Sequence, residues 1–488
     1  FNRRLMSATG GLTDRLLERI RSGRKLSFAE RLRLTALLSL PAILAQLSAI
    51  AMQYIDASMV GSLGANESAS IGLVSTSTWL FWGILSACAT GFSVQIAHLI
   101  GSADFRRARN VVRQAIVACL LFSFLLSAIG MAISSPLPGW LRADAAIHAD
   151  ASAYFCIFSL FLPALQLSFL AGAMLRCAGN MKVPSMLNVM MCVLDVILNF
   201  FLIFPTRDIS LLGLHVTMPG AGLGVRGAAL ATVMAETIVA SVMLWYLCCR
   251  YKPLRIVDER GRYLPSRQVL RQAVIIGVPI GFEHIAICGA QILVTFIVAP
   301  LGIVAIAANS FAVIAESLCY MPGYGIGEAA TTLSGQCLGA GRMKLMRSFG
   351  HISVGSAMLI MGILGVALYI WAPAIMSIMT PVDAIRELGA EVLRIEAWAE
   401  PMFGAAIVCY GFFVGMGRTV LPSIMNLGSI WVVRLTLAAL LVGSMGLKGV
   451  WIAMCVELCF RGVIFLVLLF TPRFYIRNKT NLNASSTI

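Results

Sequence analysis

Charge is the property that this sequence has least of. Only 12% of its 488 residues are Asp, Glu, Lys or Arg, while 59% are hydrophobic. Soluble domains carry about 25% charged and about 45–50% apolar residues. So few ionisable groups cannot cover a water-exposed surface of this size. This excludes a set of soluble domains, a disordered chain and a secreted disulfide scaffold, and it leaves an all-α polytopic membrane protein.

The motifs of most protein chemistry are missing as well. The 13 cysteines include no CxxC pair, so neither a zinc site nor a disulfide framework is favoured. The five histidines have no ligand spacing, and no Walker A or GxSxG string is present. The glycine-rich string at 220–227 joins two apolar segments rather than a soluble strand and helix. We therefore expect no enzyme activity and no cofactor.

The net charge of +15 first suggests a nucleic-acid partner. The basic residues, however, lie in short connections between apolar runs, and no nucleic-acid motif accompanies them. With the N-terminus placed inside, 29 Lys and Arg fall on the inner side and 6 on the outer side. This positive-inside bias predicts a multi-pass protein with both termini in the cytoplasm and no nucleic-acid partner.

Twelve apolar runs reach the length of about 20 residues that a bilayer requires. They lie at 35–60, 69–97, 111–134, 151–175, 184–205, 225–249, 273–299, 303–329, 350–373, 394–416, 422–443 and 448–470. The predicted domains are a basic N-terminal segment (1–33), an N-lobe (34–249), a cytoplasmic linker (250–272), a C-lobe (273–472) and a cytoplasmic tail (473–488).

The two halves repeat each other at a spacing of 238 residues. Pro41 recurs as Pro279, Gly101 as Gly339, and Asn188 as Asn426. A unit of six spans inserts in the same orientation each time. We therefore predict two six-helix lobes related by pseudo-two-fold symmetry about the membrane normal, an architecture that suits alternating access. Pro41 and Pro279, at equivalent places within spans, are predicted hinges.

The N-terminal segment carries leucines at helical spacing beside arginines. Leu16, Leu17 and Ile20 lie next to Arg15, Arg19 and Arg21. This pattern is typical of an amphipathic helix that lies on the cytoplasmic face of the membrane. A frayed tail is the alternative.

Acids inside spans are costly and are usually functional. Asp56 lies in the first span, and Asp195 and Asn199 lie four residues apart in the fifth, on one helical face. The sixth span adds Thr232 and, one turn deeper, Glu236. Carboxylate, amide and hydroxyl oxygens suit a proton or Na⁺, so Asp56, Asp195, Asn199 and Thr232 are the candidate cation site. A structural hydrogen-bonded Asp195–Asn199 pair is the alternative.

The second half carries different acids. Glu283 and Glu316 are candidates for substrate or proton contact, as is Glu236, with a structural role as the alternative. Glu457 and Arg461, four residues apart in the last span, are predicted to form a structural ion pair.

Several strings together resemble the MATE (multidrug and toxic compound extrusion) family. They run from about residue 34 to 472 and include PAILAQLSAIAMQYIDASMVGSLGA at 41–65, AMLRCAGNMKVPSMLN at 173–188 and MPGYGIGEAATTLSGQCLGAGR at 321–342. The resemblance implies a bacterial inner-membrane antiporter that exports amphipathic, often cationic drugs or metabolites in exchange for H⁺ or Na⁺. Asp56 matches the first-span Asp of the DinF-type branch, and Glu283 the seventh-span acid of the NorM-type branch.

One departure from the family pattern concerns the fifth span. The DinF-type branch carries Asn and then Asp four residues apart, whereas this chain has Asp195 and then Asn199. The exchange puts the cation selectivity implied by the family in doubt. We favour the N-lobe for coupling and the DinF-type branch, and we expect a monomer surrounded by membrane lipids.

Two other functions stay open. A flippase of the same wider superfamily would move a lipid-linked or polyanionic cargo, but only Arg434 and Arg461 offer positive charge within the spans away from their ends. A non-transporting scaffold or receptor would show no solute flux, and neither the loops nor the tail holds a recognisable interaction domain.

Overall fold

The structure is a computed structural model that describes residues 2–472 except 142, 212–213 and 258. Its first part contains the helices α1 (Asn2–Arg21), α2 (Phe28–Gly61), α3 (Ala65–Gly101), α4 (Phe105–Ser134), α5 (Leu137–Trp140), α6 (Ala145–Leu160), α7 (Leu162–Cys177), α8 (Lys182–Ile203) and α9 (Gly224–Trp245). A two-stranded antiparallel hairpin, β1 (Pro205–Leu211) and β2 (Leu214–Ala221), joins α8 to α9. The remainder contains α10 (Arg267–Val298), α11 (Ile303–Gly339), α12 (Met343–Met379), α13 (Asp383–Glu396), α14 (Glu400–Gly415), α15 (Val420–Gly428), α16 (Leu435–Met445) and α17 (Leu447–Phe470).

The predicted membrane spans correspond to helices of the structure. Ten helices within the described residues are long and apolar enough to cross a bilayer, and there are twelve when each of two bent helix pairs is one span. Their outer faces carry large exposed apolar side chains, such as Leu121, Phe124, Ile363 and Val366. Lipid chains are the surroundings in which such faces are stable.

The fourth and tenth predicted spans are broken rather than continuous. α6 and α7 meet at 50° around Phe161, and α13 and α14 meet at 58°. Pro163 and Pro401 stand in the first turn of the second helix of each pair. Proline lacks an amide N–H and ends the preceding helix. Because the two prolines are 238 residues apart, the breaks are a feature of the repeat.

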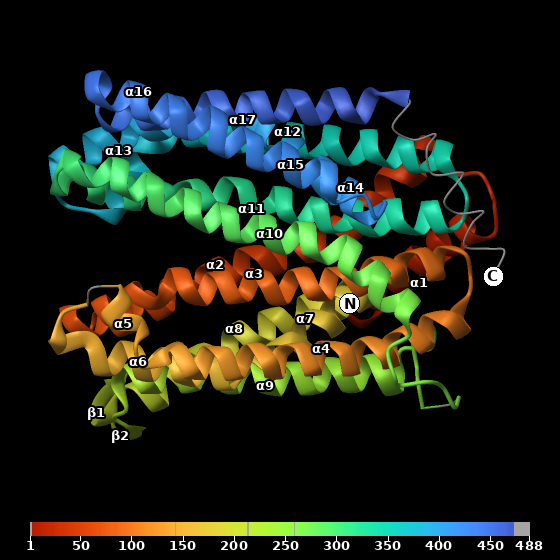
Figure 1. The fold of residues 1–488 in the computed structure, drawn as a ribbon, viewed down its shortest axis with the longest axis horizontal. Helices are drawn as coiled ribbons and strands as arrows, with labels where there is room; N and C mark the ends of the chain where they lie inside the picture. Colours follow the sequence, from red (N-terminus) through yellow and green to blue (C-terminus); the bar gives the residue numbers. More distant parts are fainter. Residues whose placement is uncertain (1, 142, 212–213, 258, 473–488) are drawn as a thin grey trace. The chain divides into compact units, whose positions relative to one another are not determined.

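The chain forms two compact units. Unit 1 comprises Phe1–Ile43, Gly101–Ala103 and Gly289–Ile488, and unit 2 comprises Leu44–Ile100 and Asp104–Cys288. Within each unit the long helices run roughly along one another (Figure 1). A large buried cluster of unit 2 includes residues of α4, α7 and α9, and one of unit 1 includes residues of α11, α12, α13 and α17. Two helices, α2 and α10, are each divided between the units. The division of the chain into lobes at 34–249 and 273–472 stays a prediction.

The linker after α9 is fastened to unit 2 by α4. The guanidinium of Arg113, 1% exposed, donates to the backbone carbonyls of Ile256 (2.8 Å) and Glu259. Arg109 pairs with the Glu259 carboxylate at 2.6 Å. Leu254 is fully buried. The polar composition of this connector thus reflects its binding to the first turns of α4 rather than a loose tether.

The N-terminal segment forms the predicted helix, but its surroundings differ from the prediction. Leu16, Leu17 and Ile20 are 4%, 1% and 0% exposed because protein covers them. The expectation that this apolar face lies on the membrane is therefore wrong. Helical periodicity identifies an apolar face, but it cannot tell whether lipid or protein covers that face.

Small residues let α3 and α10 approach closely within unit 2. A Cβ atom added to Gly83 would lie 2.6 Å from Cγ of His284, and one added to Gly91 would lie 2.4 Å from the carbonyl oxygen of Ala273. Such spacing of small residues is common where membrane helices pack. The backbone at Ala273 leaves no space for a side chain at position 91.

We predict that Gly91→Ala lowers the stability of the protein by about 1–3 kcal/mol, because the new methyl group forces two backbones apart. Gly72, on the same helix, has open space around it. Gly72→Ala is the matched control and should be neutral or slightly stabilising, since alanine favours helix. Thermal unfolding of the purified protein in detergent measures both. Equal melting temperatures for the two variants would contradict the prediction.

Candidate functional site

The predicted cation-site residues come from three helices of unit 2. Asp56 lies on α2, Asp195 and Asn199 on α8, and Thr232 on α9, which packs along α8. The four-residue spacing puts Asp195 and Asn199 on the same face of α8, where they are 0% and 1% exposed. Asp56 is half-buried. The prediction that Asp195 and Asn199 share one face of the helix is confirmed.

A single amide group joins the two carboxylates. Nδ2 of Asn199 donates to Oδ1 of Asp56 at 2.8 Å and to Oδ2 of Asp195 at 3.0 Å. The hydroxyl of Thr232 donates to the carbonyl of Ala228 at 3.2 Å and lies beside the Asp195 carboxylate. All four predicted residues thus converge. The Asp195–Asn199 hydrogen bond, expected under the structural alternative, is also present.

Two oxygen atoms at this site are buried without a hydrogen-bond partner: Oδ1 of Asp195 and Oδ1 of Asn199. A buried acceptor left unpaired costs about 1–3 kcal/mol. The amide oxygen of Asn199 is a hydrogen-bond acceptor, and so are both oxygens of Asp195 while its carboxylate is ionised. A proton on the carboxyl group or a small hard cation would satisfy them, so the residues fit either ion. Among the described residues no cluster of three or more His, Cys, Asp or Glu offers a transition-metal site.

A second layer of polar groups surrounds this site. Glu236 lies on α9, and its carboxylate is hydrogen-bonded by Ser168 of α7. Tyr154 of α6 lies close enough to Asp56 and Asp195 to interact with their charges. Ser168 and Tyr154 could not be predicted from the sequence, because single hydroxyl groups are common in membrane helices and carry no distinguishing signal.

The remaining predicted site residues are two acids on other helices and two prolines. Glu283, on α10, is 4% exposed and belongs to unit 2, whereas Glu316, on α11, is 5% exposed and belongs to unit 1. Pro41 and Pro279 both lie inside continuous helices, α2 and α10. Pro41 stands two residues before the point at which α2 passes from one unit to the other.

Unit 1 holds two buried acids that the sequence analysis missed. Glu396 ends α13, Glu400 begins α14, and both are 0% exposed. All four of their carboxylate oxygens are buried and lack a hydrogen-bond partner. The charge of Glu316 acts on both. The sequence did carry a signal for both acids, since they lie inside the tenth predicted span, close to Pro401.

Glu457 differs from Glu396 and Glu400 because both of its buried carboxylate oxygens accept hydrogen bonds. Arg461 donates to it at 2.8 and 2.9 Å, as the sequence predicted, and Arg434 adds bonds of 3.0 and 2.7 Å. The hydroxyl of Ser429 donates to the same carboxylate. The predicted ion pair is confirmed and is in fact a triad, which fastens α17 to the π-helical turn Ser429–Arg434.

Comparisons with known proteins identify the family and show the same internal repeat. The MatE family model matches residues 41–201 and 279–440, so its two matches start 238 residues apart, as the internal repeat does. A probable multidrug resistance protein NorM of Thermotoga maritima is 23% identical over 434 residues, covering 88% of this chain and 90% of its own. A protein of the same name from Bacillus thuringiensis is 26% identical over 468 residues, covering 94% and 99%.

Solved structures share the fold at low sequence identity. An outward-facing multidrug resistance MATE family transporter of the MOP superfamily superposes with a TM-score of 0.80 at 19% identity, covering 88% of this chain and 93% of its own. A MOP superfamily transporter from Pyrococcus furiosus superposes with a TM-score of 0.81 at 18% identity, covering 92% and 96%. The predicted twelve-span fold is thereby confirmed, and the placement in the DinF-type branch stays a prediction.

We predict that Glu457→Gln destabilises the protein strongly, by about 3–5 kcal/mol, because it leaves two buried guanidinium groups without their counter-charge. Glu391→Gln is the matched control. Its carboxylate pairs with Lys448 at 2.7 Å, but both side chains are nearly half exposed, and such surface pairs contribute about 0–1 kcal/mol. Thermal unfolding in detergent separates the two. Similar melting temperatures for both variants would show that the triad is not structural.

Proposed function

Because the chain belongs to the MATE family, whose members are multidrug efflux transporters and not enzymes, we propose that it is a secondary active antiporter. It exports amphipathic, cationic small molecules in exchange for H⁺ or Na⁺ by alternating access, and it needs no cofactor. The observation that carries the proposal is the convergence of Asp56, Asp195 and Asn199, with two buried oxygens left unpaired.

The chemistry of coupling follows from those unpaired atoms. A proton on one carboxyl group, or Na⁺ among the oxygens of Asp56, Asp195, Asn199 and Thr232, would neutralise buried negative charge and supply the missing partner. Binding drives transport only if the ion prefers one conformation of the protein over the other. Asp56 and Asp195 lie on different helices joined by one amide group, so a relative movement of α2 and α8 changes the distance between the oxygens.

The other buried acids have supporting roles in this proposal. Glu236 adds a carboxyl group near Asp195, and Glu283 and Glu316 are candidates for substrate or additional proton contact. Glu396 and Glu400, whose carboxylate oxygens are unpaired, are buried acids of unit 1 like Glu316. Pro41 and Pro279 are the proposed hinges. We place the protein in the inner membrane of a bacterium, as a monomer surrounded by lipids, with both termini in the cytoplasm.

A flippase for a polyanionic cargo is disfavoured by the triad at Glu457. Arg434 and Arg461, the two basic residues that lie away from the ends of the predicted spans, both donate to that carboxylate. Their positive charge is committed inside unit 1 and does not serve a phosphate-bearing substrate. A scaffold or receptor would leave the unpaired oxygens at Asp195 without a purpose.

We predict that Asp56→Asn and Asp195→Asn each reduce gradient-driven efflux at least tenfold, because an amide neither takes up nor releases a proton near neutral pH and supplies no negative charge to Na⁺. The measurement uses purified protein in liposomes, a fluorescent cationic drug, and ΔpH and Na⁺ gradients imposed separately. Asp383→Asn is the control, since that side chain is 81% exposed. Undiminished efflux by Asp56→Asn would refute the coupling role, and efflux insensitive to either gradient in the unaltered protein would refute antiport.

We predict that Asn199→Ala uncouples transport, because the two carboxylates lose the amide donor that they share. Drug should still cross the liposome membrane down its own gradient, but an ion gradient should no longer concentrate it. Asn188→Ala, three turns earlier on α8 and outside the site, is the control and should transport as the unaltered protein does. Normal gradient-driven accumulation by Asn199→Ala would overturn this prediction.

A further inference from the structure

The N-terminal segment, residues 11–31, is bound to unit 1 by more than its apolar face. Leu16, Leu17 and Ile20 are buried, and α1 contacts α11. The helix ends at Arg21, and Gly23, with φ of +78°, turns the chain back toward α2. A residue other than glycine would be strained there. We call this segment the N-terminal clasp.

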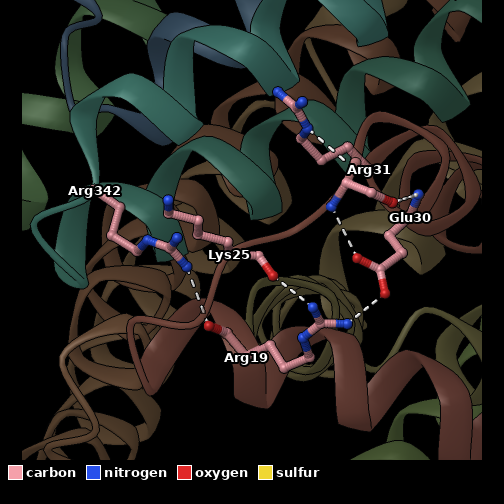
Figure 2. A network of polar contacts seen from close by, with 6 residues as sticks. Arg19, Lys25, Glu30, Arg31 and Arg342 are labelled. Atoms are coloured by element: carbon pink, nitrogen blue, oxygen red, sulfur yellow. Dashed lines mark hydrogen bonds and ion pairs between the residues drawn. The ribbon is translucent and has the colours of Figure 1, made fainter.

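Arg342, between α11 and α12, binds the end of α1. Its Nη1 donates to the backbone carbonyls of Arg19 (3.1 Å) and Ile20 (3.4 Å). The last carbonyls of a helix lack partners within the helix. A positive charge at this end also complements the helix dipole. Figure 2 shows the guanidinium of Arg342 pointing at the carbonyl of Arg19.

Arg19 in turn holds the start of α2. Its guanidinium lies between the carbonyl of Lys25 and the carboxylate of Glu30 and bonds to both (Figure 2). Glu30 also accepts from the amide of Ser27 at 2.8 Å, while the amide of Glu30 donates to the Ser27 hydroxyl at 3.2 Å. This reciprocal pair is a capping box, which fixes where α2 begins.

Arg31 completes the attachment by bonding to the hydroxyl of Ser348 on α12. The first turn of α2 is therefore tied to α1 through Glu30 and to α12 through Arg31. The same helix belongs to unit 1 up to Ile43, enters unit 2 at Leu44, and carries Asp56 near its other end.

We propose that the N-terminal clasp is a conformational device that holds the first part of α2 on unit 1, and that opening it shifts the equilibrium between the conformations of the transport cycle. A helix fastened at one end and bonded through Asp56 at the other cannot tilt freely. Weakening the clasp therefore changes how readily α2 moves and so the turnover rate. The inference rests on the proposed transport function, and Arg19, Glu30 and Arg342 act as positioning residues.

The test compares Glu30→Gln and Arg342→Gln with Arg24→Gln, an exposed arginine of the same segment. Hydrogen exchange of the purified full-length protein in nanodiscs reports on the clasp directly. We expect the amides of residues 13–26 to exchange about three to ten times faster in both clasp variants and unchanged in Arg24→Gln. Raised salt should speed exchange in the unaltered protein more than in Glu30→Gln, because the Arg19–Glu30 pair is partly exposed. Arg342→Lys keeps the positive charge and should restore slow exchange in part.

Drug efflux in liposomes supplies the second measurement. We expect turnover to change at least threefold in Glu30→Gln and Arg342→Gln, with melting temperatures equal to that of the unaltered protein and partial rescue by Arg342→Lys. If exchange rises and turnover does not change, the clasp is only structural and the inference is overturned. Unchanged exchange overturns it as well. Failure of the unaltered protein to transport would count against the proposed function, while the exchange result still decides whether the clasp exists.

Discussion

A bilayer contains no water to satisfy polar groups, and this constraint accounts for most of the structure. Backbone amides and carbonyls pair within helices, because an unpaired one in hydrocarbon costs several kcal/mol. Side chains obey the same rule. Arg434 and Arg461 are retained within spans because Glu457 lies between them and takes four hydrogen bonds from their guanidinium groups. The triad is a closed set, with charge and hydrogen bonds both satisfied.

Against that background the unsatisfied groups are informative. The amide of Asn199 serves two carboxylates at once, and the opposite oxygens, Oδ1 of Asp195 and of Asn199, are left buried and unpaired. Glu396 and Glu400 leave four more carboxylate oxygens unpaired where α13 meets α14. Natural proteins rarely keep such atoms without a reason. In a transporter, binding of an exchangeable proton or cation would be such a reason.

The order of Asp195 and Asn199 illustrates how little the exact sequence order constrains such a site. Two positions four residues apart share a helical face in either order. The order of the two residues decides whether an amide or a carboxylate faces Asp56. In this chain the nitrogen of one amide group donates to both acids, whose carboxyl groups also lie close to each other.

Much was determined by the sequence alone. Apolar run lengths, the distribution of Lys and Arg, and the 238-residue repeat predicted a twelve-span duplicated membrane protein, and four-residue spacing predicted that Asp195 and Asn199 share a face. Each of these depends on local chain geometry, which sequence encodes directly. Tertiary structure alone decided what covers the apolar face of α1, because lipid and protein select the same residues. It alone brought Asp56, from a helix more than a hundred residues away, against Asn199, and it showed which buried acids are paired and which are not. Those outcomes depend on contacts between distant segments, which a period or a motif does not record.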